Sequence, residues 1–200
     1  IEQAYRKDRV AEAFRNEYAK AAKVESDKGN TSLAIEMYEL AIEEDPLNSA
    51  LHDRFAWLLL NKAKLFDKAK DMAEKAIKLN PQNCDAVVTL ALTYYRLDEM
   101  KVADSYIDDS VKLGRPLSFA LLRKAIARFH KARSLTDTDI KRAVQLNQEA
   151  RSILTKAEKQ NSIKDGYDAK NLVSIQKHQQ FLLKQASKLE RMIKKQLIDS

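Results

Sequence analysis

Three histidines and one cysteine are the side chains in this chain of 200 residues that most often bind metals or act as nucleophiles. His52, His130 and His178 are far apart, and no pair has the i,i+4 spacing that presents two zinc ligands on one helix face. Cys84 is the single cysteine, which excludes an internal disulfide and a cysteine-cluster zinc site and is typical of a reducing compartment. We expect His52 to be a packed histidine of the core or its edge, and Cys84 to be a passive thiol at a helix start.

Adjacent carboxylates are the other candidates for chemistry, because general acid–base catalysis often uses paired carboxyl groups. Glu43–Glu44 and Asp108–Asp109 fall late in predicted helices, where solvated faces are expected. Glycine-rich loops that could hold a phosphate are absent from the sequence. The sequence therefore predicts no catalytic site, no metal and no cofactor, and we expect a protein that is not an enzyme.

The composition favours an all-helical protein. The chain has three Gly and three Pro, whereas average usage would give about 14 and about 10 at this length. This scarcity argues against a sandwich, a barrel or a Rossmann-type sheet, whose turns need these residues. No apolar run approaches the roughly 18 residues of a membrane span, and no signal-peptide pattern is present. We expect a cytoplasmic location, or a nuclear one in a eukaryote, and, because the chain starts at Ile1 rather than Met, a module of a larger protein.

An internal repeat organises the first part of the chain. The segments AIEEDPLN at 41–48 and AIKLNPQN at 76–83 match with an offset of 35 residues. Two series of small residues recur with nearly the same period, and they are Ala22, Ala56 and Ala91, and Ala34, Ala69 and Ala103. Alanines at these positions let paired helices approach closely, and Asp-Pro or Asn-Pro ends the second helix of a pair. Because each pair exposes an apolar face that only a neighbour can cover, the pairs must stack.

These positions resemble the tetratricopeptide repeat family. The resemblance covers three repeats at 15–48, 49–83 and 84–117. Its residues in the first repeat are Tyr18, Ala21, Ala22, Ala34, Tyr38, Ala41 and Pro46; in the second, Phe55, Ala56, Leu59, Ala69, Ala73, Ala76 and Pro81; and in the third, Leu90, Ala91, Tyr94, Ala103 and Ile107. The sequence departs from the family at Glu25, His52, Val87 and Ser110. The resemblance implies an α-solenoid of helix-turn-helix repeats.

The resemblance also implies a concave partner-binding groove lined by the first helix of each repeat. The residues that match its lining, or lie beside it, are Lys23, Asp53, Arg54, Trp57, Val88, Leu92, Tyr95 and Arg96. Trp57, Val88, Leu92 and Tyr95 would form an apolar floor, with the charged residues around it. The alternative is that Trp57 and Tyr95 pack under the C-terminal helix or a further repeat. The lysines and asparagines with which chaperone-binding members hold a C-terminal carboxylate are not reproduced, so we do not expect chaperone-tail recognition.

Helical periodicity continues on both sides of the three repeats. Residues 1–14 are predicted to be a helical extension or the end of a preceding repeat, and 118–160 a degenerate fourth helical pair. Residues 161–200 are predicted to be a loop followed by a long C-terminal helix. This helix either caps the array with its apolar stripe or projects as a coiled-coil or partner-binding helix.

The net charge of +7 is unevenly distributed. Residues 1–117 carry 18 basic and 21 acidic side chains, whereas residues 118–200 carry 18 basic and 8 acidic. The candidate basic patch in the second part consists of Arg123, Lys124, Lys184, Lys188 and Arg191. We expect a scaffold that binds a protein or peptide partner in the groove. The alternatives are a nucleic-acid-binding or -sensing array that uses the basic segment, and self-assembly through the C-terminal helix; oligomeric state and partner identity stay open.

Overall fold

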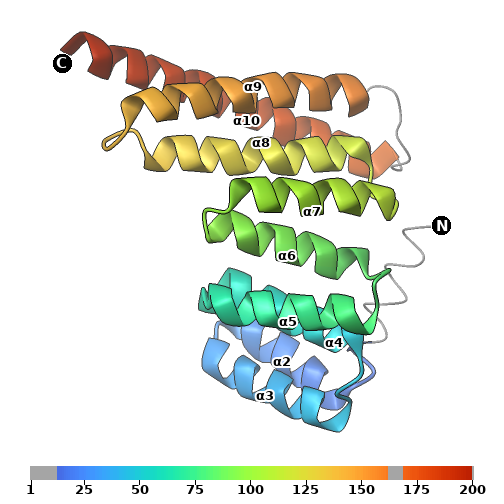
Figure 1. Cartoon of the computed structure of the whole chain (residues 1–200). Helices are drawn as coiled ribbons and strands as arrows, with labels where there is room; N and C mark the ends of the chain where they lie inside the picture. Colours follow the sequence, from blue (N-terminus) through green and yellow to red (C-terminus); the bar gives the residue numbers. More distant parts are fainter. Residues whose placement is uncertain (1–12, 162–168, 200) are drawn as a thin grey trace. The chain divides into compact units, whose positions relative to one another are not determined.

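The structure, a computed structural model, describes residues 13–161 and 169–199 (Figure 1). Over these residues the chain is helical and has no β-strand, which confirms the predicted all-α class. The predicted N-terminal extension lies outside the described residues apart from Ala13 and Phe14, and the predicted loop lies outside them apart from Asn161. The chain divides into two compact units, Ile1–Gly114 and Arg115–Ser200.

The N-terminal unit consists of three helical hairpins, in which α2 packs against α3, α4 against α5, and α6 against α7 (Figure 1). The helices are α2 (Glu17–Lys28), α3 (Thr31–Glu44), α4 (Ser49–Leu58), α5 (Phe66–Leu79), α6 (Cys84–Arg96) and α7 (Met100–Lys112). The periodic alanines explain the close packing, because Ala22, Ala34, Ala56, Ala69, Ala91 and Ala103 are all completely buried. Neighbouring hairpins also touch, since α4 contacts both α3 and α6.

Repeated asparagines start the first helix of every hairpin. The side-chain Oδ1 atoms of Asn16, Asn48 and Asn83 accept hydrogen bonds from backbone N–H groups in the first turns of α2, α4 and α6. These bonds satisfy N–H groups that have no partner inside the helix. The first hairpin turns at Gly29, whose φ of 91° is accessible to glycine without strain. The helices α3 and α5 end directly before Asp45-Pro46 and Asn80-Pro81.

The second hairpin contains a π-helical turn, η1 (Leu59–Ala63), directly after α4. The two small positions that characterise a repeat are 12 residues apart in the first and third repeats but 13 apart in the second, from Ala56 to Ala69. A π-turn takes up one more residue per turn than an α-helix. The extra residue of the second repeat is therefore accommodated in η1, and the alanines on both sides keep their buried positions.

The C-terminal unit consists of α8 (Leu117–Ser134), α9 (Ile140–Asn161) and α10 (Ala169–Asp199), which pack against one another. Asp139 starts α9 by accepting a hydrogen bond from the N–H of Arg142 at 3.0 Å. The apolar stripe of α10 is buried in this unit through Leu182, Ala186, Leu189 and Ile193. The amide of the buried Asn147 on α9 donates to the carbonyl oxygen of Ala186 at 3.0 Å and fixes the register of α10. The predicted long C-terminal helix is confirmed, and over this stretch its apolar stripe is covered by helices of its own chain.

Candidate partner-binding site

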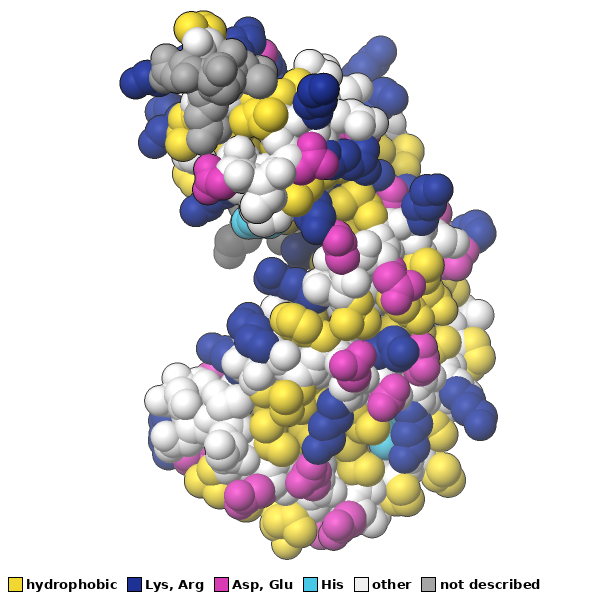
Figure 2. Space-filling model, turned by 60° about the vertical axis from the view of Figure 1, so that its left-hand side comes forward, with side chains coloured by type: hydrophobic (Ala, Val, Ile, Leu, Met, Phe, Trp, Pro, Cys, Tyr) yellow, Lys and Arg dark blue, Asp and Glu magenta, His cyan; other side chains and the backbone are white. Residues whose placement is uncertain are grey.

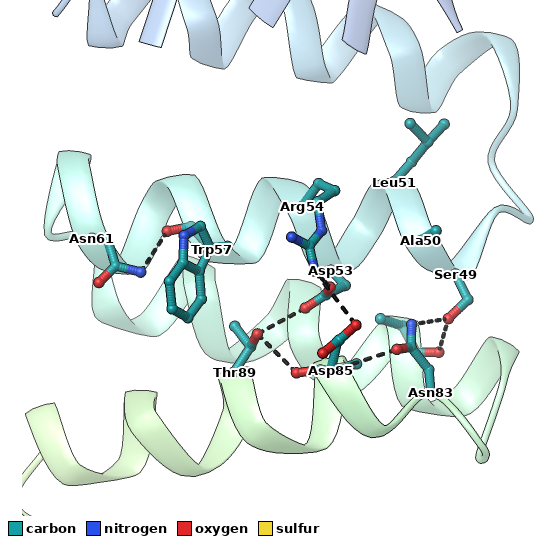
Figure 3. Close-up of polar contacts among 12 residues, drawn as sticks. Ser49, Ala50, Leu51, Asp53, Arg54, Trp57, Asn61, Asn83, Asp85 and Thr89 are labelled. Carbon is teal, nitrogen blue, oxygen red and sulfur yellow. Dashed lines mark hydrogen bonds and ion pairs between the residues drawn. The ribbon is translucent and has the colours of Figure 1, made fainter. Parts of the chain in front are cut away.

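A buried polar network joins α4 to α6 in the N-terminal unit (Figure 3). The Asp53 side chain is 2% exposed, and its Oδ1 accepts a hydrogen bond from the hydroxyl of Thr89 at 2.7 Å. Its other oxygen, Oδ2, accepts from Nη2 of Arg54 at 2.6 Å. The same Nη2 lies 3.8 Å from Oδ2 of Asp85. One guanidinium therefore lies between two buried carboxylates, so this part of the α4–α6 contact is held in a fixed arrangement.

The electrostatics of this network favour the charged form of Arg54. Burial disfavours a charged guanidinium, but the carboxylates of Asp53 and Asp85 outweigh it, so the pKa of Arg54 is raised above its ordinary value. Tyr38 of α3 lies close enough to interact with this group, and burial raises the pKa of its hydroxyl to about 12. The Tyr38 ring stacks on Phe55 of α4, with centroids 5.6 Å apart. The network is thus packed against an aromatic pair that stays neutral at physiological pH.

A second set of polar contacts fixes the start of the same two helices. Ser49 donates to the carbonyl oxygen of Ala76 at 2.8 Å, and the Asn83 amide donates to the Ser49 hydroxyl at 2.8 Å (Figure 3). These bonds tie the end of α5 to the starts of α4 and α6. A hollow of about 150 Å³ lies beside them, between Leu47 and Asn83. Side-chain hydrogen bonds therefore hold the α4–α6 contact at the starts of both helices and again at Asp53 and Thr89.

Trp57 is the large apolar side chain that the site presents to solvent. It follows Asp53 by one helical turn on α4, is 41% exposed, and extends toward α6 in Figure 3. The Asn61 amide in η1 donates to the carbonyl oxygen of Trp57 at 3.0 Å, where the α-helical pattern gives way to the π-turn. This hydrogen bond holds the backbone of Trp57 in place, while the Trp57 side chain stays accessible to solvent.

The other predicted groove residues have different environments. Val88 is buried, and Leu92 is partly buried against the core, so both contribute more to packing than to an open floor. The Tyr95 hydroxyl donates to Asp104 of α7 at 2.5 Å, which directs it toward its own hairpin. Lys23 is exposed and paired with Asp27 at 2.5 Å, and Arg96 is exposed in the last turn of α6. The structure thus brings Asp53, Arg54 and Trp57 together; whether the eight residues bind a partner stays a prediction.

The residues of the predicted basic patch lie on two helices of the C-terminal unit. On α8, the Arg123 guanidinium lies 5.0 Å from the centre of the Phe119 ring, and Lys124 is half-buried. On α10, Lys184, Lys188 and Arg191 are exposed. On the face in Figure 2, basic, acidic and apolar side chains are interspersed. The two patch residues on α8 are therefore partly buried, whereas the three on α10 are exposed.

In the described residues, no group of three or more His, Cys, Asp or Glu side chains is placed to hold a metal ion. His52 is completely buried, with Nε2 at 2.9 Å from the carbonyl oxygen of Pro46, and Cys84 is buried. No helix in the described part of the chain is both long and apolar enough to cross a bilayer.

Two features of the site were not predicted from the sequence. The α4–α6 network pairs Asp53 with Thr89, which is 36 residues away, and only the stacking of the hairpins brings them together. The π-turn did have a sequence signal, the 13-residue spacing between Ala56 and Ala69. That spacing alone fits a longer loop equally well.

Comparisons with known proteins agree with this description. A tetratricopeptide repeat profile matches residues 18–46 and 56–83. No curated protein matches the sequence significantly. Solved structures with a similar fold include YrrB, a TPR protein with an unusual peptide-binding site, at 19% identity, 86% coverage of this chain, 90% of that chain and a TM-score of 0.50.

Two further solved structures have the same fold. MamA is 15% identical, with 89% of this chain and 92% of that chain covered and a TM-score of 0.52. A thermophilic TPR protein from Thermus thermophilus is 14% identical, with 82% and 97% covered and a TM-score of 0.50. Because the sequence identities are below 20%, the similarity to these three solved structures shows the fold alone. Residues 18–46 and 56–83 match the tetratricopeptide repeat profile, and the chain is a helical-repeat protein with the tetratricopeptide repeat fold.

Proposed function

We propose that the α4–α6 face of the N-terminal unit binds a peptide segment of a partner protein and that Trp57 is its anchor. The observation that carries this proposal is an exposed Trp57 ring beside the buried Asp53–Arg54–Asp85–Thr89 network. Tryptophan is among the residues that most often dominate binding energy in interfaces. A surface whose polar groups are already fixed loses little conformational entropy when a ligand binds.

The chemistry of the face favours a ligand with an apolar or aromatic side chain flanked by polar backbone. Asp53 already bonds Arg54 and Thr89, so a carboxylate ligand would have to displace an intramolecular ion pair to reach the guanidinium. The partly exposed Asn61 and Trp57 remain as residues that a peptide backbone or side chain can contact. A neighbouring fold, that of YrrB, is described as having a peptide-binding site, which is consistent with this use of the architecture.

The experiment uses the fact that Trp57 is the only tryptophan of the chain. A displayed random-peptide library is selected on the whole chain, and affinities of selected peptides are measured for the wild type, Trp57→Ala and Leu65→Ala. Leu65 is the matched control, because it is an exposed apolar residue at the start of α5. We expect Trp57→Ala to weaken binding by about 2 kcal/mol or more, and Leu65→Ala by less than about 0.5 kcal/mol. Binding should also change the Trp57 fluorescence.

Circular dichroism of each variant confirms that the helices are retained. The proposal is overturned if the selection yields no binder, or if the binders have the same affinity for Trp57→Ala as for the wild type.

A further inference from the structure

An apolar row flanked by acidic residues is exposed on α3. Leu33 and Leu40 are two helical turns apart and both exposed, and Leu47, just beyond the helix end, is 78% exposed. Glu36 and Glu43 lie on the same helix face, because they follow the first two leucines by three residues. These five residues are named the α3 face.

The second repeat shows that the fold does not need leucine at these positions. With the 35-residue offset of the repeats, Leu33, Leu40 and Leu47 correspond to Lys68, Lys75 and Gln82. The three polar residues are exposed, and Lys68 forms an ion pair with Glu39. Since the same structural positions are occupied by lysine and glutamine in the next hairpin, the leucines of α3 are not explained by packing inside their own hairpin. An exposed apolar row of this kind indicates an interaction surface.

A complementary row is exposed on α10. Lys184, Lys188, Arg191 and Lys195 recur at intervals of four, three and four residues, on the side of α10 opposite the buried stripe. Phe181 and Met192 accompany them and are 57% and 56% exposed. These six residues are named the α10 face. A shallow hollow of about 520 Å³ lies over it, lined by the four basic residues, Gln185 and Met192.

We propose that the α3 face binds the α10 face of a second copy of this chain. Both faces carry exposed apolar side chains, so each can cover those of the other. Their charges are opposite, because the α3 face contributes Glu36 and Glu43, whereas the α10 face contributes four cations. Opposite charges around a shared apolar contact give both attraction and register.

The charges also decide which copies can pair. Two α10 faces would place like charges against each other, and so would two α3 faces. Association therefore uses two different surfaces, and each copy brings one of each. Such heterologous contacts close into a small ring or continue to larger assemblies, and they weaken as salt screens the charges.

A second copy explains the α10 face better than a nucleic acid does. Phosphate groups would pair with the cations, but they offer nothing to Met192, and Phe181 is the one aromatic ring on the face that could stack on a base. The leucines of α3 cover both apolar side chains. This interaction does not involve Trp57 and is independent of the peptide site proposed above.

The test is a charge exchange between two variants, followed by sedimentation velocity over a wide range of concentrations. One variant, Lys184→Glu/Lys188→Glu/Arg191→Glu, makes the α10 face acidic, and the other, Glu36→Lys/Glu43→Lys, makes the α3 face basic. Each alone should associate at least about tenfold more weakly than the wild type, because both of its faces then carry the same sign. Their mixture should associate again, since each variant supplies a face that complements one on the other.

Two further variants separate this interaction from changes in net charge or folding. Leu33→Lys/Leu40→Lys copies the residues of the second repeat, so it should fold normally and lose association. Lys62→Glu/Lys78→Glu/Lys101→Glu alters the same number of charges at exposed lysines that belong to neither face, and it should associate like the wild type. Trp57→Ala should also associate normally, which distinguishes failure here from failure of the peptide-site proposal.

The proposal is overturned by a wild type that is monomeric at every concentration, or by a mixture of the two charge variants that does not associate. It is equally overturned if reversal of the α10 charges abolishes binding to DNA, RNA or anionic vesicles while the sedimentation of the chain is unchanged.

Discussion

At the scale of single residues, Asp53 shows how a polar residue predicted to lie beside a groove becomes part of the core. Its two oxygens bind Thr89 and Arg54, so the buried charge is matched by a hydroxyl and a guanidinium. Buried ion pairs add little net stability, because desolvation offsets the attraction, but loss of one partner leaves an uncompensated charge. The Asp53–Thr89 hydrogen bond and the Arg54–Asp85 ion pair therefore serve mainly to fix the geometry of α4 against α6, next to the exposed Trp57.

His52 is a second buried polar residue, and its protonation opposes folding. Burial lowers its pKa below the ordinary value of 6.5, and its Nε2 faces the carbonyl oxygen of Pro46. The facing carbonyl requires a proton on Nε2, so the neutral ring has its lone pair on Nδ1, for which the described residues offer no hydrogen-bond partner. A second proton on Nδ1 would place an unpaired charge inside the second hairpin.

This predicts that His52 lowers the stability of the fold in mild acid. Below about pH 6.5 the unfolded chain binds a proton at His52 that the folded chain does not bind. The free energy of unfolding therefore decreases as the pH is lowered, until the pH is below the pKa of His52 in the folded state. His52→Gln keeps a donor for Pro46 and should reduce this loss, measured by urea denaturation between about pH 7.5 and about pH 5. His130→Gln is the control, because His130 is exposed. Equal pH dependence in His52→Gln and the wild type would contradict the prediction.

At the scale of elements, the π-turn η1 shows how a repeat absorbs an insertion. The second repeat has one residue more between its small positions than its neighbours, yet Ala56 and Ala69 are both completely buried. The extra residue is therefore taken up where it does not disturb the contacts between hairpins. The left-handed Lys64, with φ of 59°, follows the turn directly and redirects the chain into α5.

Deletion of Lys62 should consequently be tolerated. It shortens the spacing between Ala56 and Ala69 to that of the other repeats, so an ordinary α-helical turn can replace η1, whose hydrogen-bond pattern is rare. We expect the free energy of unfolding to change by less than about 1 kcal/mol, measured by urea denaturation.

Deletion of Lys28 is the matched control, because Lys28 follows Ala22 by the same six residues as Lys62 follows Ala56. That deletion moves Gly29 out of its left-handed position in a repeat of normal length, so it should cost more than about 2 kcal/mol. Similar losses in the two deletion variants would show that η1 does not hold the inserted residue.

The elements also show what the sequence can and cannot predict. The buried alanines and the Asn-Pro and Asp-Pro helix ends follow from local geometry, so the hairpins and their order are predictable. The repeat pattern predicts Asp53 at the edge of an apolar floor, but it is buried because its partner Thr89 comes from the next repeat. Val88 and Leu92 lie deeper than an open floor requires, for the same reason. Such pairings depend on how one hairpin is rotated against the next, which the repeat pattern leaves undetermined.

At the scale of the whole molecule, the distribution of charge matters more than its sum. The net charge of +7 combines a slightly acidic first part, residues 1–117, with a strongly basic second part, residues 118–200. A chain with opposite charges on separate surfaces can attract its own copies, whereas a uniformly basic chain would repel them. The same separation places the exposed acidic row on α3 and the exposed basic row on α10. The net charge alone would have suggested only a polyanionic partner.

The division into two compact units predicts that the chain does not unfold in a single step. In helical-repeat proteins each hairpin contacts mainly its neighbours, so cooperativity is local. Trp57 is the only tryptophan and belongs to the N-terminal unit, whereas far-ultraviolet circular dichroism records the helices of both. We expect the urea unfolding curve measured by fluorescence to differ from the curve measured by circular dichroism.

Two variants assign the steps to the units. Leu189→Ala opens a cavity under α10 at a cost of about 2–5 kcal/mol. It should shift the part of the dichroism curve that reports the C-terminal unit and leave the fluorescence curve unchanged. Leu51→Ala, in the core of the N-terminal unit, should shift the fluorescence step instead. Coincident curves, or a fluorescence step that moves with Leu189→Ala, would show that the two units unfold as one.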